Sequence, residues 1–410
     1  MTDELVEGDT LEVTVGAPAH GGHCVARLGG EHGRVVFVRH ALPGERVTAQ
    51  VTEVHRGYLR ADAIEIHEAS PDRVTAPCAY AKADGCGGCD LQHVSDAGQL
   101  GWKTAVVHET LRRIGGMTQD QISGVRVQRL PGGLLGWRSR VRYAVDAADR
   151  PGLLKHRSHE VVAIDRCLIA HPHIQELDVL SRRWPDADAV ATVASSGGDV
   201  SVLATGHAGD DDWRAASPIE GPPEVREAAA GRDWTVPAAG FWQVHPAAAD
   251  TLVDAVLEML KPAPGETAWD LYGGAGLFAG ALAERTGARV TLVESAFSGA
   301  AAARANLADL PLVEVVEAKV ERALRRRRVT GPVDVVVLDP PRSGAGAEVV
   351  RAIAAAGPRA VAYVACDPAA LGRDIGTFAE LGWTATEVRA YDCFPMTRHI
   401  ECVALLTPTR

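Results

Sequence analysis

Cys366 is the residue of this chain whose position could support covalent chemistry. It follows the apolar run Val361 to Ala365, and Asp367-Pro368 then breaks this run before a helix-like segment, AALGRDIGTFAEL. We therefore expect Cys366 at the carboxyl end of a buried strand, where open α/β sheets bind their ligands. The alternative for this segment alone is a buried cysteine that serves as a small hydrophobic side chain. Two neighbouring motifs favour the functional interpretation.

The first motif predicts a nucleotide-binding βαβ unit. A strand that ends in Asp270 precedes a turn containing Gly273, Gly274 and Gly276, and a helix and a second strand closing on Glu294 follow. Glycines let the backbone approach a ligand, and an acidic residue about 20 positions later can bind ribose hydroxyls. The glycine spacing differs from the GxGxxG of dinucleotide sites. It suits S-adenosylmethionine (SAM), which has no pyrophosphate.

The second motif is a buried strand that starts at Val333 and runs into the loop DPPRSG, where two prolines stiffen the backbone after Asp339. A surface turn is the alternative for this loop. However, Asp339, Asp270 and Cys366 all follow predicted strands, and the carboxyl ends of parallel strands meet at one edge of a sheet. We therefore expect a doubly wound, Rossmann-like α/β fold with these three residues in one crevice.

The bulk composition is that of an ordinary soluble protein with two to three domains. The chain has 410 residues, of which 46% are hydrophobic and 23% charged. Its start, MTDELVEGDT, is acidic and lacks an apolar stretch, so we expect a cytoplasmic protein with no signal peptide and no membrane segment. Eight cysteines in such a chain indicate metal binding or catalysis rather than a disulfide framework.

Two predicted units precede the catalytic one. Short runs of alternating apolar and polar residues between positions 8 and 66, separated by Gly and Pro, are typical of a small five-stranded OB-like barrel. Residues 67–236 alternate in places as an antiparallel sheet, and 95–115 reads as a helix. We predict three domains, 1–66, 67–236 and 237–410, with this helix packed on the third.

Four cysteines have the spacing of a metal site. Cys78, Cys86 and Cys89 form the pattern C-x7-C-x2-C, and Cys167 is the natural fourth ligand. The glycines around Cys86 and Cys89 allow the tight backbone that two chelating thiolates require. The spacing itself leaves the metal open, because four thiolates suit zinc and an iron-sulfur cluster about equally.

The net charge of −11 counts against non-specific nucleic-acid binding, which depends on Lys and Arg. A local basic face could still bind RNA. We favour a middle cluster with two interleaved aromatic residues over the run Arg325 to Arg328, which reads as a solvated helix end. The middle cluster consists of Arg138, Arg140, Arg142, Lys155, His156 and Arg157, with Trp137 and Tyr143.

The motifs DLYGGAG, DPPRSG, YVACDP and DCFPMTRHIE together resemble the SAM-dependent RNA 5-methyluridine methyltransferases that carry a TRAM domain. The resemblance covers nearly the whole chain. It implies that the N-terminal barrel is a TRAM domain that contacts RNA, and that the four cysteines hold a [4Fe-4S] cluster, with zinc as the alternative. It also implies ribosomal or transfer RNA as substrate, and we expect a monomer.

The resemblance further implies covalent catalysis. A Cys366 thiolate would add to carbon 6 of uracil and make carbon 5 nucleophilic enough to accept the methyl group. Glu401 matches the family's base, which removes the remaining proton from carbon 5; His399 is the rival by intrinsic pKa. The positions that match SAM-binding residues are Gln243, Tyr272, Gly274, Glu294 and Asp339.

Three residues depart from the family pattern: Gly273 replaces a cysteine, and Leu277 and Asp367 replace asparagines. Leu277 removes a polar contact to SAM. Asp367 adds a negative charge beside the thiol, which should raise the thiol pKa and slow its attack. An RNA-binding or chaperone protein with impaired catalysis is therefore the alternative function. Cytosine carbon-5 and amino-group methyltransferases fit less well, since Arg342 stands where they carry a cysteine or an aromatic residue.

Overall fold

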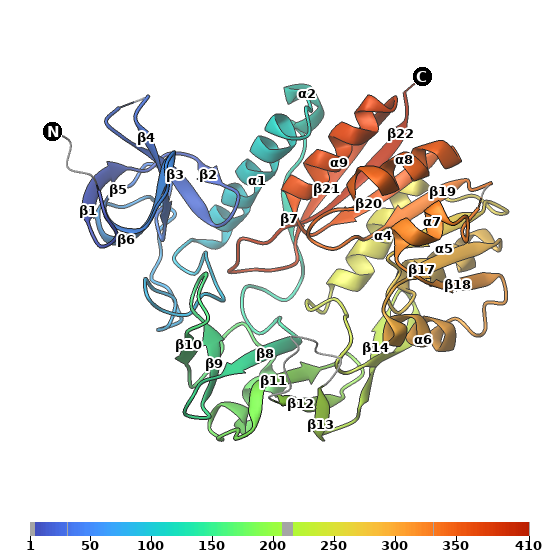
Figure 1. Cartoon of the computed structure of the whole chain (residues 1–410), viewed down its shortest axis with the longest axis horizontal. Helices are drawn as coiled ribbons and strands as arrows, with labels where there is room; N and C mark the ends of the chain where they lie inside the picture. The colour runs from blue at the N-terminus through green and yellow to red at the C-terminus, as the bar shows by residue number, and fades with distance from the viewer. Residues whose placement is uncertain (1–4, 31, 207–215, 331, 410) are drawn as a thin grey trace.

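The structure is a computed structural model that describes residues 5–30, 32–206, 216–330 and 332–409. Its first part is a curled sheet at the N-terminal end of the chain (Figure 1). Every second residue of β1 is buried, as expected for strands with one face on a core. The five-stranded prediction is one strand short, because the two-residue β2 adds a sixth. The sheet has the order β1-β5-β6-β4-β3-β2, from β1 (Thr10–Thr14), β2 (Pro18–Ala19), β3 (His23–Leu28), β4 (Arg34–Arg39), β5 (Arg46–Val54) and β6 (Tyr58–Glu68).

A helical connection follows and packs against the last part of the chain. Ser95 caps α1 (Asp96–Arg113) by accepting a hydrogen bond from the Gly98 N–H at 3.0 Å. On the buried face of α1, Lys103 is fully buried and donates to the Asp392 carboxylate at 2.5 Å. The short α2 (Gln119–Ile122) and β7 (Val127–Arg129) come next, and β7 pairs with β21 of the C-terminal sheet.

The central segment forms an antiparallel sheet of order β10-β9-β8-β11-β12-β13. Its buried side chains form a separate hydrophobic cluster that includes Trp137 and Tyr143. The elements are β8 (Arg140–Val145), β9 (Pro151–Leu154), β10 (Val161–Ala163), α3 (Pro172–Gln175), the 3-10 helix η1 (Asp178–Leu180), β11 (Ala187–Ala194), β12 (Val200–Gly206) and β13 (Ser217–Glu220). The hairpin of β14 (Glu224–Ala229) and β15 (Arg232–Pro237) follows.

The C-terminal region is built on an eight-stranded sheet of order β18-β17-β16-β19-β20-β22-β21-β7. The first five strands in this order, β18, β17, β16, β19 and β20, are mutually parallel. The next strand, β22, runs antiparallel to β20. The chain order of the strands reverses between β16 and β19, which makes this point the expected ligand crevice. The strands are β16 (Ala268–Leu271), β17 (Val290–Glu294), β18 (Val313–Glu317), β19 (Val335–Leu338), β20 (Ala360–Ala365), β21 (Trp383–Asp392) and β22 (Glu401–Pro408).

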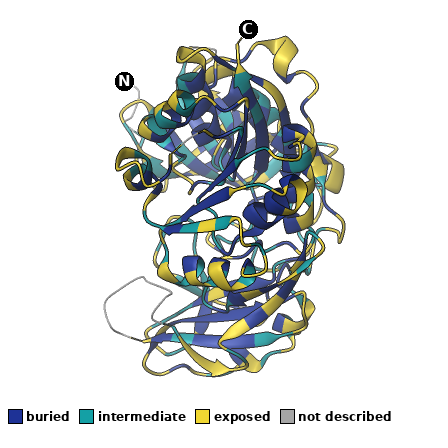
Figure 2. Cartoon of the chain, turned by 90° about the vertical axis from the view of Figure 1, so that its right-hand side faces the viewer, coloured by how far each residue is buried: buried dark blue, intermediate teal, exposed yellow. Residues whose placement is uncertain are grey.

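Helices cover both faces of this sheet, so its central strands are buried throughout (Figure 2). Val336 and Leu338 belong to the hydrophobic cluster on one face, whereas Val335 and Val337 belong to the cluster on the other. The helices are α4 (Ala248–Leu260), α5 (Leu277–Thr286), α6 (Phe297–Asn306), α7 (Val320–Arg325), α8 (Gly346–Ala356) and α9 (Pro368–Glu380). None of the described helices is long and apolar enough to cross a membrane.

Candidate active site

Cys366 lies directly after β20, at the carboxyl edge of the sheet. It is partly exposed and lines a cavity of about 40 Å³, so it is not enclosed in the hydrophobic core. The N-terminal sheet supplies part of the cavity wall through His20 and Gly21, which follow β2. The remaining wall residues are Val106, Arg342, Asp367, Pro368, Arg398, His399 and Ile400.

Two carboxyl groups border the same edge. Glu401 is the first residue of β22, and the pairing of Cys402 with Ala365 places it beside the end of β20. Asp339 directly follows β19 and keeps partial solvent contact, whereas Glu401 is buried. Desolvation raises the pKa of Asp339 to about 7. Burial, and then the charge of Asp339, raise the pKa of Glu401 well above its usual range, so the two carboxylates resist joint ionisation.

The thiol itself is hard to ionise. Burial, and then the charges of Glu401 and Asp339, raise the pKa of Cys366 to about 12, while the Arg342 guanidinium acts in the opposite direction. Asp367 also raises this pKa, as expected from the sequence, but its influence is smaller than that of burial and of the two other carboxylates. The main obstacle to thiolate formation is therefore desolvation.

Asp367 has a structural role that its sequence position did not reveal. Its side chain caps α9 by accepting hydrogen bonds from the Ala369 and Ala370 N–H groups, both at 2.9 Å. Its second oxygen lies 2.9 Å from Nε2 of His20, a residue of the N-terminal sheet region. Burial alone would raise the pKa of Asp367, but the hydrogen bonds from His20, Ala370 and Ala369 lower it to about 2. Three hydrogen-bond donors thus stabilise the negative charge of Asp367.

His399, the rival base, contacts Arg342 at 3.2 Å through its ring nitrogens. Burial, and then the charges of Arg342 and Arg398, lower the pKa of His399 to about 3. A histidine with so low a pKa is a weak proton acceptor at neutral pH. The low pKa therefore counts against His399 as a proton acceptor.

The Gly-rich turn lies between β16 and α5 at the point where the strand order reverses. Tyr272, Gly274 and Gly276 all have positive φ angles, of 66°, 53° and 103°, so the two glycines occupy positions that disfavour side chains. Tyr272 is a non-glycine residue in this strained region, as is often seen at ligand sites. Its hydroxyl lies 3.5 Å from the Glu321 carboxylate.

Glu294, the residue predicted to bind the ribose, contacts this turn. It accepts hydrogen bonds from the Gly274 N–H at 3.0 Å and from the Ala296 N–H at 2.5 Å. Asp270 is fully buried and accepts from the Ala279 N–H at 2.9 Å through one oxygen, whereas its other oxygen has no hydrogen-bond partner among the described residues. An unpaired buried acceptor beside a glycine turn fits a ligand that brings a hydrogen-bond donor or a positive charge, as SAM does.

Gln243 is buried between β15 and α4. Among the described residues, no hydrogen bond or ion pair connects its side chain to Glu294 or Asp339. Leu277, which replaces the family asparagine, is buried in the hydrophobic cluster beneath α5. The structure thus gathers Cys366, Glu401 and Asp339 at one edge of the sheet, and Gln243 is placed near them only by the family motif.

The four metal-site cysteines are all free thiols and lie in one neighbourhood. Cys86 is within electrostatic range of Cys167 and Cys78, and Cys89 is within range of Cys167 and Cys86. In the ranges that the structure describes, however, no three His, Cys, Asp or Glu side chains stand close enough to hold one metal ion. As they stand, the four thiols are near one another but do not form a closed coordination shell.

The basic cluster predicted from the sequence is partly wrong. Arg140 is buried and forms an ion pair with Glu227 at 2.9 Å, so it cannot bind RNA. Trp137 and Tyr143 are only 3% and 2% exposed and therefore offer no ring to a nucleobase. Tyr143 lies on the face of β8 that packs on the central hydrophobic cluster, and Trp137 belongs to the same cluster just before the strand. Arg140 lies on the opposite face, where Glu227 and the Ala238 carbonyl cover it, and strand alternation alone does not reveal this cover. Arg142 points to solvent.

Nothing in the sequence indicates that His20 and Arg398 connect the N-terminal sheet region to the edge that carries Cys366. Arg398 donates to the Gly21 carbonyl at 2.7 Å, and its own N–H donates to Asp90 at 3.1 Å. These contacts fix the loop of the N-terminal sheet against the catalytic edge. Motif reasoning could not find them because the paired residues are hundreds of positions apart in the chain.

Comparisons with known proteins agree with this architecture. Residues 4–64 match a family model described as the TRAM domain, and residues 233–409 match the model of tRNA (Uracil-5-)-methyltransferase. The fold resembles the crystal structure of a Pyrococcus abyssi tRNA (uracil-54, C5)-methyltransferase in complex with S-adenosyl-L-homocysteine. That similarity has a TM-score of 0.72 at 23% identity and covers 97% of this chain and 100% of the other. The fold is thus that of a SAM-dependent methyltransferase joined to a TRAM domain.

Relatives with similar sequences narrow the class to a family. The chain is 46% identical to an uncharacterised RNA methyltransferase of Streptomyces avermitilis, over 98% of this chain and 99% of the relative. It is 35% identical to another from Corynebacterium efficiens, over 99% of this chain and 96% of the relative. The protein belongs to the TRAM-containing family of SAM-dependent RNA (uracil-5-)-methyltransferases.

Proposed function

We propose that this enzyme methylates carbon 5 of a uridine in ribosomal or transfer RNA through a covalent adduct with Cys366. The observation that supports this most is the meeting of Cys366, Glu401 and Asp339 at one edge of the sheet, beside the glycine turn. A binding protein without catalysis has no need of a partly exposed thiol beside a buried carboxyl group. The test is the trapping of a denaturation-resistant adduct on RNA that contains 5-fluorouridine.

In the proposed reaction, the Cys366 thiol first loses its proton to solvent. The thiolate sulfur then forms a bond to carbon 6 of the uracil ring, and the electrons of the 5,6 double bond move toward the exocyclic oxygen on carbon 4. Arg342 stabilises the thiolate before attack. Bound SAM supplies the methyl group for carbon 5. Glu401 then takes the proton from carbon 5, the double bond re-forms, and the bond between sulfur and carbon 6 breaks.

The cavity at Cys366 has room for a few water molecules but not for a uracil ring. The target uridine must therefore leave its stack and displace side chains of the cavity wall. The side chains of His20 and Arg398 are the candidates to move, because that of His20 is 49% exposed and that of Arg398 donates to a loop carbonyl of the N-terminal sheet region. The proposed units 1–66, 67–236 and 237–410 would then act together, since the first and third share this wall.

For the SAM site we propose Gln243, Tyr272, Gly274, Glu294 and Asp339. Glu294 would accept hydrogen bonds from the ribose, and the open space beside Gly274 would let the ligand approach the backbone. Tyr272 would pack against the bound ligand. The free oxygen of Asp270 would face the positively charged end of the molecule.

SAM should stabilise the protein more at pH 8 than at pH 6. Desolvation raises the pKa of Asp270 and of Asp339 to about 7 in the folded protein. A raised folded-state pKa contributes stability that is present at low pH and lost as the pH rises through about 7. The positive charge of SAM offsets the carboxylates once they ionise. Differential scanning fluorimetry should show a rise in Tm on SAM addition that is a few degrees larger at pH 8.

The control for this experiment is Asp270→Asn, which keeps the shape of the side chain and removes its titration. We expect this variant to lose part of the pH dependence of the SAM-induced shift. An equal shift at both pH values in the wild-type protein would contradict a SAM site next to these carboxylates.

We propose that Cys78, Cys86, Cys89 and Cys167 hold a metal group, with [4Fe-4S] favoured by the family resemblance and zinc as the alternative. The proposal is supported by four free thiols in one neighbourhood and by the glycines that flank Cys86. The thiols would have to draw closer together to bind it. Anaerobically purified protein should contain about four iron and four sulfide per chain, with absorbance near 400 nm. One zinc per chain without colour would refute the cluster.

A further inference from the structure

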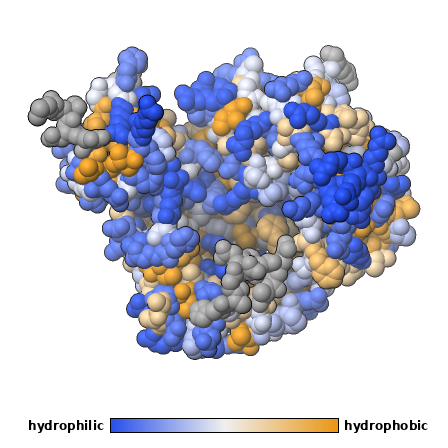
Figure 3. All heavy atoms as spheres, viewed as in Figure 1, coloured by the Kyte–Doolittle hydropathy of each residue, from blue (hydrophilic) through white to orange (hydrophobic). Residues whose placement is uncertain are grey.

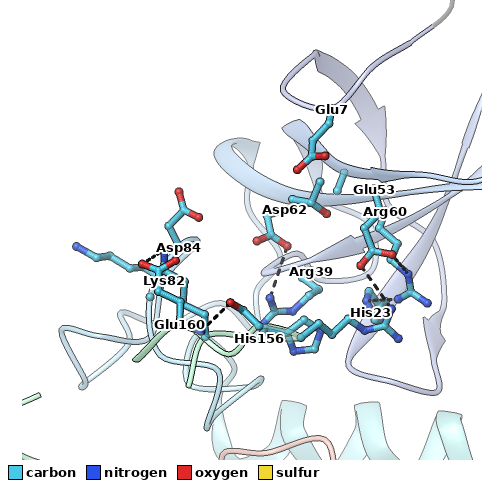
Figure 4. A pocket seen from close by; sticks show the side chains of 16 residues that line it. Glu7, His23, Arg39, Glu53, Arg60, Asp62, Lys82, Asp84, His156 and Glu160 are labelled. Carbon is cyan, nitrogen blue, oxygen red and sulfur yellow. Dashed lines mark hydrogen bonds and ion pairs between the residues drawn. The ribbon is translucent and has the colours of Figure 1, made fainter. Parts of the chain in front are cut away.

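A second cavity lies away from Cys366 and contains neither the thiol nor the residues proposed for the SAM site. It measures about 340 Å³ and opens between the N-terminal sheet and two loops of the central region (Figure 4). Arg39, Arg60 and Asp62 reach into it from β4 and β6, and His156 closes it from the opposite side. In the space-filling view, mostly hydrophilic residues cover the surface where the N-terminal sheet meets the central region (Figure 3).

Two polar groups that line this cavity lack hydrogen-bond partners. Arg39 is only 8% exposed, yet its charge partner Asp62 is 3.8 Å away, which is too long for a hydrogen bond. In the described part of the chain, Nε of Arg39 and Nε2 of His156 are buried without a hydrogen-bond partner. Buried polar groups without partners are costly, so the cavity fits a ligand that supplies both a donor and an acceptor.

The charge balance of the lining indicates the kind of ligand. The cavity wall contains five Arg and Lys side chains, but it also contains five carboxylates. A phosphate would meet both charges equally and gain little. A nucleobase, whose edge carries adjacent donors and acceptors, matches the adjacent Arg39 guanidinium and Asp62 carboxylate.

Arg60, which lines the cavity, also contacts a group of aromatic rings on the N-terminal sheet. The rings of His55 and Tyr58 stack with centroids 4.4 Å apart, and the Arg60 guanidinium lies 5.5 Å from the Tyr58 ring and 5.9 Å from the Phe37 ring. All four side chains are partly exposed on the N-terminal sheet. Such arrays of aromatic and arginine side chains bind unpaired bases on OB-like sheets.

The cavity lies near the edge of the sheet that carries Cys366. Arg39 and His156 both lie within electrostatic range of Arg398, which lines the Cys366 cavity. A single RNA strand could therefore place one nucleotide at Cys366 and another in the 340 Å³ cavity.

We propose that the 340 Å³ cavity receives a second extruded base of the substrate RNA, separate from the target uridine, and that this base is a guanine. Guanine presents two neighbouring N–H donors to the Asp62 carboxylate and a carbonyl oxygen to the Arg39 guanidinium. Adenine and cytosine offer a single amino donor to the carboxylate, and uracil offers one imino donor. The inference rests on the proposed RNA substrate but not on the proposed chemistry at Cys366.

The test uses an RNA transcript that the wild-type protein methylates, chosen from transfer RNAs and ribosomal RNA fragments. Kethoxal, which modifies the N1 and N2 edge of guanine, should fail to modify one unpaired guanine when the wild-type protein is bound. In Asp62→Asn this protection should be lost and the Kd for the RNA should rise about tenfold, with SAM affinity unchanged. Arg39→Gln should have the same effects.

Two matched controls make the changes specific. Glu65→Gln removes a carboxylate from the exposed face of the same strand, and Arg27→Gln removes an exposed arginine from β3. Both should retain the protection and the affinity. The inference is overturned if no guanine is protected by the wild-type protein, or if protection survives in folded Asp62→Asn.

The outcome can be separated from that of the proposed function. If the wild-type protein forms the 5-fluorouridine adduct while protection is absent, only the guanine site is wrong. If a guanine is protected but no adduct forms, the site stands and the covalent chemistry is wrong.

Discussion

Replacing Cys366 with alanine is expected to lower methyl transfer to RNA by at least about 10⁴-fold and to abolish the adduct with 5-fluorouridine RNA. The nucleophile makes a bond that nothing else at this edge can supply, and loss of a covalent nucleophile removes most of the rate acceleration. The affinity for SAM and for RNA should change by no more than a few fold, because the thiol contributes little binding surface. Denaturing gels with labelled RNA measure the adduct, and single-turnover assays measure the rate of methyl transfer.

Cys402→Ala is the matched control for this experiment. Cys402 is fully buried on β22, with its backbone paired to Ala365, so the substitution removes a neighbouring sulfur without touching the cavity. The variant should lose some stability to thermal unfolding but should still form the adduct. If Cys366→Ala continued to methylate RNA, Cys366 would not be the nucleophile.

Replacing Glu401 with glutamine is expected to separate methylation from release. In this variant the Cys366 thiol can still add to the uracil ring and carbon 5 can still accept the methyl group. The glutamine, however, cannot remove the proton from carbon 5. With SAM and ordinary uridine RNA, a methylated adduct should therefore accumulate that resists denaturation. Multiple turnover should fall by about 10²- to 10⁴-fold, the usual contribution of a general base.

The control for this variant is Glu387→Gln on β21, an exposed residue that pairs with Arg389. It should turn over normally and leave no stable adduct. His399→Gln provides the competing test. If His399→Gln accumulated the methylated adduct and Glu401→Gln did not, His399 would be the base and Glu401 would not.

The raised pKa values also explain how this site could work despite its acidic surroundings. Burial raises the pKa of Glu401 and of the Cys366 thiol, which disfavours the charged form of each group in the free protein. Bound SAM would add a positive charge near Asp339 and Asp270, which lowers the pKa of nearby acids. The enzyme would therefore form its reactive thiolate mainly after SAM has bound.

Much of the catalytic region could be predicted from local sequence. The apolar runs before Asp270, Asp339 and Cys366 specify buried strands, and the residues after them break those strands, so their shared edge followed from the rules of parallel sheets. Family motifs then suggested roles for Glu401 and Gln243. The boundaries at 66 and 236 stay predictions, and β7 shows that residues 127–129 extend the C-terminal sheet from outside the predicted third unit.

The sequence determined which residues end strands, where the backbone must turn, and which family the chain belongs to, because these properties depend on neighbours within a few positions. Only the tertiary structure decided which side chains meet. His20 holds Asp367 from 347 positions away, Arg140 is buried against Glu227, and Arg39 and Asp62 share a cavity wall. The hydrophobic pattern along a strand or helix indicates which face of that element is buried. The residue that each side chain contacts depends on how distant elements pack, and only the folded chain brings those elements together.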